Sequence, residues 1–311
     1  MTATRVFPSA TRVNSYTVRV RARNSGVVTT RRDGGRTSSS DAQVWRPFAR
    51  IRTDRPSATV RAESTPGCHP GQLGTFAAMA RMSGWVPMCA AMLGAGFAGP
   101  TNFAGMCDFV VMTRSSTMGI AGPALVKAAT GQSLTNEELG GPDVQATQHG
   151  LADLAVEDDA AALDAIKRFL AYFPANAREP LPITACDDPA DRGPDELLEL
   201  VPTNSRKGYD VRKVIELLAD VGSTMELKPR HARNLVTTLG RLDGRPVGFL
   251  ANNPGHLAGM LDAKACDKGA HFIALCDAFG LPIVSLIDVP GFLIGPGAER
   301  TALGRRSAKL I

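Results

Sequence analysis

Three glycines, Gly94, Gly96 and Gly99, follow an apolar run and have the spacing of a dinucleotide-binding fingerprint. That fingerprint requires a long helix from the third glycine and an acidic residue about 20 residues further on, after the next strand. Here only eight residues separate Gly99 from Asp108, which leaves room for about two helical turns. The following apolar run ends at residues 113–114 without an acidic residue. The sequence therefore argues against NAD binding.

Glycines between a buried strand and a short helix also suit a different chemistry. A missing side chain lets a backbone N–H approach a ligand, and the first N–H groups of a helix carry partial positive charge. Together these features stabilise a developing oxyanion, such as the enolate of a thioester. The alternative is a tight turn whose glycines are required by sterics alone. The turn by itself leaves both interpretations open.

Predicted helices and strands alternate along the chain on both sides of this turn. Residues 73–84 predict a helix that ends at Gly84, and residues 158–173 predict an amphipathic helix. Pro123 and Gly131 are typical of the first turn and the end of a helix over 124–131. The other predicted elements are a buried strand over 86–93, a turn over 94–99, a short helix over 100–106 and a strand over 108–112.

The second half of the chain repeats this order. Its predicted elements are a strand pair within 235–254, a helix over 263–280, a buried strand over 281–289 and a glycine-rich turn from residue 290. Asp243–Gly244 joins the strand pair and is a strong hairpin signal. Residues 174–208 are rich in Pro, Asp and Arg without apolar periodicity, which indicates a linker. The sequence therefore predicts two α/β domains of one architecture.

The net charge of +5 is unevenly distributed along the chain. Residues 1–71 contain 13 arginines, no lysine and four acidic residues, so they carry +9. The remaining 22 basic and 26 acidic side chains give −4, so the basic charge does not indicate nucleic-acid binding by the folded part. Residues 1–71 are interpreted as a disordered basic tail, an organelle presequence or a non-native leader. In each case we expect them not to pack on the rest.

The six cysteines and five histidines show no metal-ligand spacing. Most cysteines lie inside apolar runs, where a reduced cysteine packs as a small hydrophobe. No apolar run reaches the roughly 18 residues of a membrane span. We therefore expect a reduced chain without a metal or a membrane contact. We expect it in the cytoplasm, or in the mitochondrial matrix if residues 1–71 are a presequence.

Four stretches occur in a fixed order along the chain. They are SGWVPMCAAMLGAGFAGP, IAGPALVKAATGQSLTNEELGG, GRPVGFLANNP and DKGAHFIALCDAFGLPIVSLIDVPGF. In order and approximate spacing they resemble the carboxyltransferase (beta) subunit of biotin-dependent acyl-CoA carboxylases, the propionyl-CoA and methylcrotonyl-CoA carboxylase group. The resemblance covers residues 74–311. Relative to that family, the chain is expected to be truncated at both ends.

The resemblance implies an α/β fold of the crotonase-like (ClpP/crotonase) ββα spiral type, with parts of two tandem domains. On this basis, residues 72–173 are the second half of an N-terminal domain that binds acyl-CoA. After the linker over 174–208, residues 209–311 are the first half of a C-terminal domain on the biotin side. Domains of the family continue to a second glycine-rich turn that supplies the biotin-side oxyanion hole. The resemblance therefore implies a fragment that is inactive alone.

The implied reaction transfers a carboxyl group from carboxybiotin to an acyl-CoA such as propionyl-CoA. The backbone amides of Ala98 and Gly99 are expected to bind the thioester oxyanion. Pro100 departs from the turn of the family, because proline has no N–H. The other implied contacts are Gly94, Gly96, Phe97, Gly122 and Pro123 for the substrate, and Pro290, Gly291 and Phe292 for biotin.

The resemblance also implies partners and leaves alternative functions open. Biotin would be carried by a partner subunit, beside a biotin carboxylase subunit, and copies of the chain would assemble as a trimer of dimers. A decarboxylase subunit of a sodium-pumping complex shares these motifs. A crotonase-fold hydratase or isomerase needs a glutamate base after a proline, and here Ala124 follows Pro123. A third alternative is an assembly partner without catalytic activity.

Other titratable residues are given structural interpretations. These are a solvated helix face for Lys268 and His271, a loop for His256, a turn cap for Asp288, a helix start for Asp158–Asp159 and the linker for Asp187–Asp188. The sequence therefore predicts no catalytic dyad among them.

Overall fold

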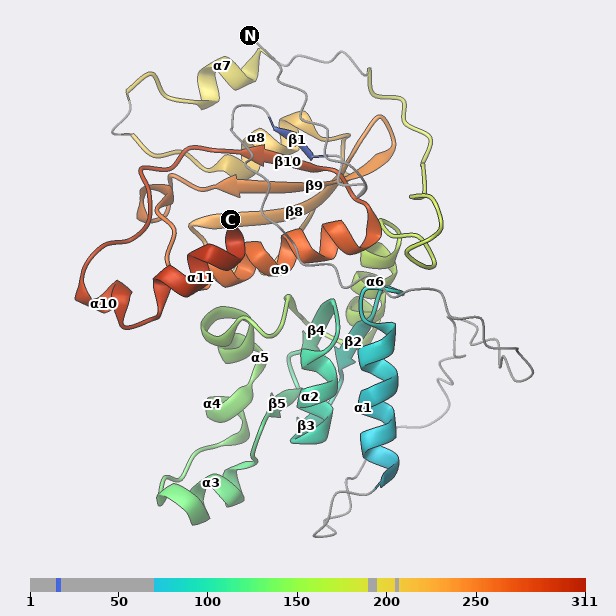
Figure 1. Cartoon of the computed structure of the whole chain (residues 1–311), viewed down its shortest axis with the longest axis vertical. Helices are drawn as coiled ribbons and strands as arrows, with labels where there is room; N and C mark the ends of the chain where they lie inside the picture. Colours follow the sequence, from blue (N-terminus) through green and yellow to red (C-terminus); the bar gives the residue numbers. More distant parts are fainter. Residues whose placement is uncertain (1–14, 18–69, 190–194, 205–206) are drawn as a thin grey trace.

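The structure is a computed structural model that describes residues 15–17, 70–189, 195–204 and 207–311. The described residues form two halves that lie one above the other in Figure 1. The C-terminal half contains a five-stranded sheet with the strand order β1-β10-β9-β8-β7. The N-terminal half contains a three-stranded sheet, β2-β4-β6, and a two-stranded sheet, β3-β5.

A hairpin forms the centre of the five-stranded sheet. Strands β8 (Leu235–Leu242) and β9 (Arg245–Asn252) pair antiparallel around Asp243 and Gly244, which have φ of 52° and 70°. Positive φ at both turn residues matches the type I′ turn that fits the twist of a hairpin. The predicted hairpin is therefore confirmed.

Three further strands extend this hairpin. Strand β10 (Ile283–Leu286) runs parallel to β9, and β7 (Met225–Leu227) runs antiparallel to β8. Residues Ser15–Thr17 form β1, which pairs parallel with β10. This pairing differs from the expectation that residues 1–71 do not pack on the rest. Residues 1–14 and 18–69 lie outside the described residues.

Helices cover both faces of the five-stranded sheet. On one face, α8 (Val211–Leu218) packs with Val236 and Phe249 of the hairpin. On the other, α9 (Ala263–Phe279) packs with Leu239, since side chains alternate between the faces of a strand. Helix α9 begins at a cap in which the Asp262 carboxylate accepts the Ala265 N–H at 2.8 Å, and it ends at Gly280 with φ of 71°.

The N-terminal half is built on a short parallel sheet. Its strands are β2 (Cys89–Met92), β4 (Phe109–Thr113) and β6 (Leu154–Val156). Helix α6 (Asp159–Leu170) starts at Asp158, whose carboxylate accepts the Ala161 N–H, as expected for a helix start. The rings of Phe109, Phe169, Phe173 and Phe279 contact one another in succession, from β4 through α6 and the residues after it to α9, first stacked, then tilted and finally edge to face. This aromatic series joins the two halves in one core.

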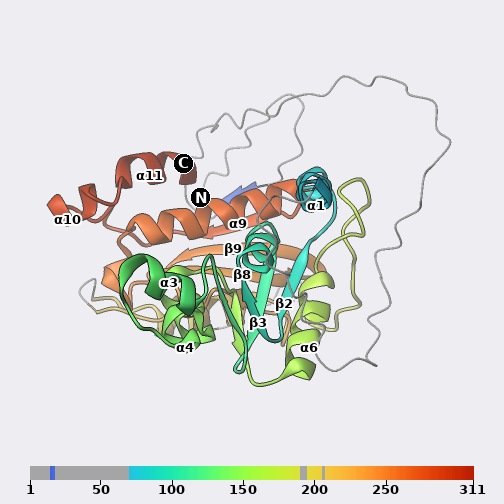
Figure 2. The same ribbon diagram turned by 90° about the horizontal axis from the view of Figure 1, so that it is seen from below.

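The remaining helices have 13 residues or fewer and lie mostly at the surface (Figures 1 and 2). They are α1 (Pro70–Met82), α2 (Gly99–Gly105), α3 (Pro123–Thr130), α4 (Asn136–Gly140), α5 (Pro142–Val144), the π-helix η1 (Gln145–His149), α7 (Glu196–Leu200), the 3-10 helix η2 (Leu257–Gly259), α10 (Pro296–Glu299) and α11 (Leu303–Leu310). Gly84 after α1 and Gly131 after α3 both have positive φ, as their predicted helix-ending role requires.

Two further segments differ from the sequence prediction. The predicted turn 94–99 contains strand β3 (Ala95–Phe97), which pairs with β5 (Thr117–Gly119). The predicted linker 174–208 contains α7, while its residues 190–194 and 205–206 lie outside the described residues. Within the described part of the chain, no helix combines the length and the apolar content that a bilayer crossing requires.

Candidate functional site

The pairing of β3 with β5 brings the residues predicted for the substrate together. Phe97 lies opposite Gly119 in the ladder. A Cβ atom at Gly119 would lie 3.1 Å from the Phe97 ring, and one at Gly122 would lie 3.7 Å from it. The segment from Gly94 to Gly99 therefore lies next to Gly122 and Pro123, although they are more than 20 residues apart.

The three glycines of the fingerprint have different roles. A Cβ atom at Gly96 would lie 2.3 Å from the methyl group at the flexible end of Met92 and 3.1 Å from Cβ of Pro100, so a side chain there would displace its neighbours. At Gly94 and Gly99 a Cβ atom would meet nothing within 4 Å. Close packing therefore disfavours a side chain at Gly96, whereas Gly94 and Gly99 border open space.

The backbone at Ala98 adopts an unusual conformation. Its φ of 63° and ψ of −113° lie in a region that favours glycine. The Ala98 N–H donates to the Gly119 carbonyl at 2.8 Å, and the Ala98 carbonyl accepts the Asn102 N–H at 3.1 Å. The Ala98 amide is therefore engaged, which differs from the expectation of two neighbouring free donors. Since Pro100 has no N–H, Gly99 supplies the donor of this turn.

We expect Ala98→Gly to raise the free energy of unfolding by about 1 kcal/mol. Relief of about 1–3 kcal/mol of backbone strain outweighs the roughly 0.4–1 kcal/mol that the freer unfolded chain costs. Chemical denaturation measures this difference. The control is Ala104→Gly within helix α2, which Ala98 precedes; this variant should lose at least about 1 kcal/mol. Equal losses in the two variants would contradict strain at Ala98.

The residues predicted for the biotin side lie in the loop after β10. The Gly291 carbonyl accepts the Leu261 N–H at 3.1 Å, and Leu261 forms an isolated parallel bridge with Phe292. Gly291 has φ of 141°, and a Cβ atom there would meet nothing within 4 Å. The loop continues to α10, which lies apart from β3 and α3 in both views (Figures 1 and 2). The structure therefore does not bring the biotin-side set, which includes Pro290, to the glycine turn.

Lys268 is buried, and the expectation that it lies on a solvated face is wrong. Its side chain enters the interior from α9, and its residue is 3% exposed. The ammonium group donates to the carbonyls of Lys228, His231 and Leu235 at 2.9, 2.9 and 2.7 Å. Burial lowers the pKa of Lys268 to about 7. His271, one turn further on, is exposed as expected.

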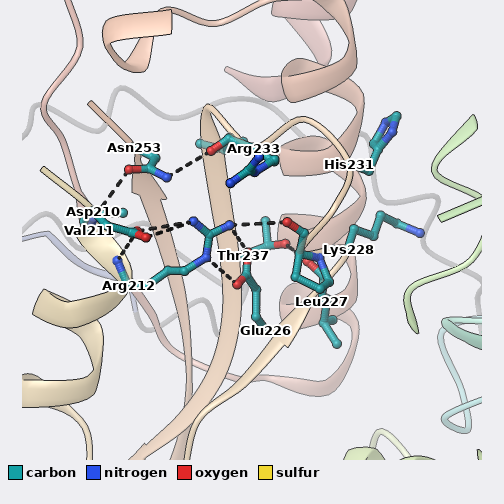
Figure 3. A network of polar contacts seen from close by, with 12 residues as sticks. Asp210, Val211, Arg212, Glu226, Leu227, Lys228, His231, Arg233, Thr237 and Asn253 are labelled. Atoms are coloured by element: carbon teal, nitrogen blue, oxygen red, sulfur yellow. Dashed lines mark hydrogen bonds and ion pairs between the residues drawn. The ribbon is translucent and has the colours of Figure 1, made fainter. Parts of the chain in front are cut away.

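A polar network holds the segment to which Lys268 donates (Figure 3). Arg212 binds Glu226 of β7 through two hydrogen bonds of 2.7 and 2.9 Å, and it also pairs with Asp210 at 3.2 Å. Asp210 caps α8 by accepting the Arg212 N–H, a position that the capping preference for aspartate before an apolar run could have indicated. The network fixes the start of α8 against β7 and the residues that follow it.

Basic side chains of the C-terminal half bind backbone carbonyls at the end of the π-helix η1 in the N-terminal half. Lys228 donates to the Gly150 carbonyl at 2.7 Å and pairs with the buried Asp153 at 3.1 Å. Lys264 donates to the carbonyl of residue 148 at 3.0 Å, and Nδ1 of His231 donates to that of residue 147 at 2.9 Å. Burial lowers the pKa of His231. These bonds satisfy carbonyls that a helix end leaves free.

Two cavities lie outside the glycine turn. One of about 440 Å³ lies beside this junction and is lined in part by Lys228, Lys264 and Lys268, whose ammonium groups already bind carbonyls. The other, of about 450 Å³, lies at the linker and the hairpin turn.

One group of potential metal ligands occurs among the described residues, in the second cavity. Cys186, Asp188 and Asp220 have ligand atoms within 4.8 Å of one another. Asp188 accepts the N–H of residue 221 at 2.7 Å, and Asp220 accepts those of residues 243 and 244 at 3.0 and 2.8 Å. The Asp220 carboxylate therefore anchors the hairpin turn, and the Asp188 carboxylate ties the predicted linker to the segment after α8.

Two further titratable residues, Asp288 and His256, were given structural interpretations from the sequence. Asp288 was expected to cap a turn, but its carboxylate accepts the Tyr209 hydroxyl at 3.0 Å. Burial and this carboxylate raise the pKa of Tyr209 to about 12. His256 precedes η2 in a loop, as expected, and is half-buried.

A model of the carboxyl transferase domain matches residues 63–311. The chain belongs to the carboxyl transferase domain family. The family also accounts for the α/β fold, so the crotonase-like fold class predicted from the sequence is confirmed.

Members of the carboxyl transferase domain family with assigned activities are similar to this chain. The carboxyltransferase subunit of propionyl-CoA carboxylase from Haloferax mediterranei is 41% identical over 231 residues, which are 74% of this chain and 45% of the relative. The methylmalonyl-CoA carboxyltransferase 12S subunit of Propionibacterium freudenreichii subsp. shermanii is 39% identical, over 76% of this chain and 45% of the relative. The chain thus spans less than half the length of these relatives.

A solved structure of the carboxyl transferase domain family has the same fold. The transcarboxylase 12S hexamer, with hydrolysed methylmalonyl-coenzyme A bound, superposes with a TM-score of 0.75 at 38% identity. The superposition covers 77% of this chain and 47% of the other.

Proposed function

We propose that this chain supplies the acyl-CoA side of a biotin-dependent carboxyltransferase, with an acyl-CoA such as propionyl-CoA as the acceptor of the carboxyl group. Membership of the carboxyl transferase domain family supports the reaction class. The names of the relatives, which specify propionyl-CoA and methylmalonyl-CoA, support the substrate class. The observation that carries the proposal is the turn at Gly99, the first residue of α2, where a Cβ atom would meet nothing within 4 Å and a ligand therefore has room to approach the backbone.

The turn at Gly99 suits the charge that develops in this reaction. Loss of the α-proton of a thioester gives an enolate with negative charge on its oxygen, which a pre-organised N–H stabilises. The Gly99 N–H takes this role. Apolar side chains flank Gly122 and Pro123 in the sequence. They are Ile120 and Leu125, which are 69% and 62% exposed. They offer a surface for the acyl and thioether parts of the substrate.

The loop around Gly291 has features that fit the flat bicycle of biotin. Open space borders Gly291, and Phe292 and Ile294 are exposed next to it. Carboxybiotin, when bound, supplies the carboxyl group. Pro290, Gly291 and Phe292 would hold the ring by apolar contact. We further propose that a partner subunit carries the biotin and that copies of this chain assemble with one another, as the hexamer of transcarboxylase 12S does.

A second candidate function is decarboxylation of an acyl-CoA. The alpha subunit of methylmalonyl-CoA decarboxylase from Propionigenium modestum is 37% identical over 74% of this chain. Both reactions use the same enolate, so the site on this chain would be shared. Carboxyl transfer to propionyl-CoA and carboxyl loss from methylmalonyl-CoA, measured with a biotin carrier, distinguish the two.

We expect Gly99→Val to weaken propionyl-CoA binding at least tenfold, about the effect of one lost hydrogen bond. The valine side chain would fill the open space beside the donor amide, whereas the absence of neighbours within 4 Å leaves the fold intact. Isothermal titration calorimetry measures the affinity. The matched control is Gly304→Val in α11, where a Cβ atom also meets nothing within 4 Å. Unchanged affinity in Gly99→Val would show that the turn is only structural.

A further inference from the structure

We propose that Thr101 is a positioning residue that sets the direction of the Gly99 amide. This inference rests on the proposed function, because it concerns the same donor. Thr101 lies in the first turn of α2 and is 5% exposed. Its side chain does not border the open space, so it acts through the backbone of the turn.

The Thr101 hydroxyl lies between the two strands that form the turn. Its oxygen is 2.7 Å from the Gly96 carbonyl of β3. It is also 2.8 Å from the carbonyl of Gly119 in β5 and 2.8 Å from the Gly119 N–H. Three polar groups of the backbone therefore meet one side-chain oxygen.

The number of protons decides how these contacts are arranged. A hydroxyl has one proton to donate and two lone pairs that accept. The Gly119 carbonyl already accepts the Ala98 N–H at 2.8 Å. We assign the Thr101 proton to the Gly96 carbonyl, which is the nearer of the two at 2.7 Å, while the oxygen accepts the Gly119 N–H. The hydroxyl thus bridges β3 and β5 where the ladder ends.

This bridge stabilises a backbone conformation that an alanine adopts at a cost. A non-glycine residue in such a region costs about 1–3 kcal/mol and persists only where its surroundings hold it. Ala98 is held by Gly119 on one side and by the Asn102 N–H on the other. The Thr101 bridge fixes Gly119 itself. Without the bridge, Gly119 loses a contact that fixes it, so the acceptor of the Ala98 N–H shifts and the direction of the Gly99 amide changes with it.

Helix α2 has other anchors that do not depend on the hydroxyl. Phe103 stacks on Phe76 of α1 with ring centroids 4.5 Å apart, and Ala104 is buried in the core. Removal of the hydroxyl should therefore alter the turn and leave the helix in place. This separation makes the proposal testable by substitution.

The test compares two ligands that differ only at the thioester oxygen. Propionyl-CoA carries the carbonyl, and S-propyl-CoA, a thioether, lacks it. The ratio of their dissociation constants reports the contact of that oxygen with the turn. The contribution of the CoA moiety to binding is common to both ligands and cancels in the ratio. Calorimetry is done on the 311-residue chain and on the variants Thr101→Val, Thr101→Ser and Thr101→Ala.

We expect the unsubstituted chain to prefer propionyl-CoA about tenfold, the value of one hydrogen bond. Thr101→Val should reduce this ratio to about one without changing the affinity for S-propyl-CoA, and Thr101→Ser should restore it. Thr101→Ala gives the same comparison if valine prevents folding. A ratio that stays at tenfold without the hydroxyl overturns the role of Thr101 alone. If the unsubstituted chain binds neither ligand, or binds both equally, the proposed function fails together with this inference.

Discussion

Lys268→Met is expected to lower the free energy of unfolding by about 3 kcal/mol. Methionine has a similar length but no donor, so three buried carbonyls lose the partner that the ammonium supplies. Each unsatisfied buried polar group costs about 1–3 kcal/mol. The variant also avoids the cost of burying a charged lysine, which offsets part of the total loss from the three carbonyls. Urea unfolding followed by circular dichroism measures the difference.

The matched control for this lysine is Lys264→Met. Lys264 lies one turn earlier on α9, is exposed and donates a single bond to the carbonyl of residue 148. Its substitution should cost less than about 1 kcal/mol. Equal effects of the two substitutions would contradict the importance of the buried ammonium.

The pKa of Lys268 also predicts a pH dependence of the Lys268→Met effect. Because this pKa is about 7 in the fold and 10.5 ordinarily, the unfolded chain binds more protons between these values. The stability that Lys268 confers therefore rises as the pH rises from about 7 towards 10. The difference between the unsubstituted chain and Lys268→Met should widen over this range. A difference that does not change with pH would exclude a lowered pKa.

The second large effect is expected for Asp153→Asn, with a loss of about 3–5 kcal/mol. Asp153 is 3% exposed and pairs with Lys228, whose side chain is 12% exposed. Asparagine can still accept the Val110 N–H that Asp153 accepts at 2.8 Å. It leaves the ammonium of Lys228 buried without a counter-charge, which is the costly part of the change.

Thermal and urea unfolding measure the loss, and a double-mutant cycle assigns it. Lys228→Met removes the unpaired charge, so the double variant should be more stable than Asp153→Asn alone. The control is Asp164→Asn, because Asp164 forms an exposed pair with Lys167 and should lose less than about 0.5 kcal/mol. A loss in Asp153→Asn that matches this control would refute the buried pair.

Local signals predicted much of the secondary structure. Gly131 and Gly280 end their helices in the left-handed conformation, and Asp158 caps α6, because each effect depends on residues within one turn. The hairpin at Asp243–Gly244 is equally local. The strands β3 and β5 were missed, since three residues show no periodicity and acquire their conformation from pairing over 20 residues away.

The candidate site could be predicted only in part. The glycine spacing located the turn, but the Gly119 carbonyl decides that the Ala98 amide is engaged. That contact comes from a separate strand. Lys268 was misassigned because charge suggests exposure, although it falls on the apolar stripe of α9 that contains Cys266, Gly269 and Phe272. The pairing of Asp153 with Lys228 spans 75 residues and has no local signal.

Four cysteines, two partly buried and two fully buried, give each half of the molecule its own reporters of local opening. Cys89 and Cys107 belong to the N-terminal half, and Cys266 and Cys276 lie on α9. Burial raises the pKa of all four thiols, to about 11 for Cys107 and Cys266, so alkylating reagents meet almost no thiolate at neutral pH. A thiol reacts when its segment opens and its pKa returns to the ordinary value. The labelling rates of the two pairs therefore tell whether the two halves open together or one before the other.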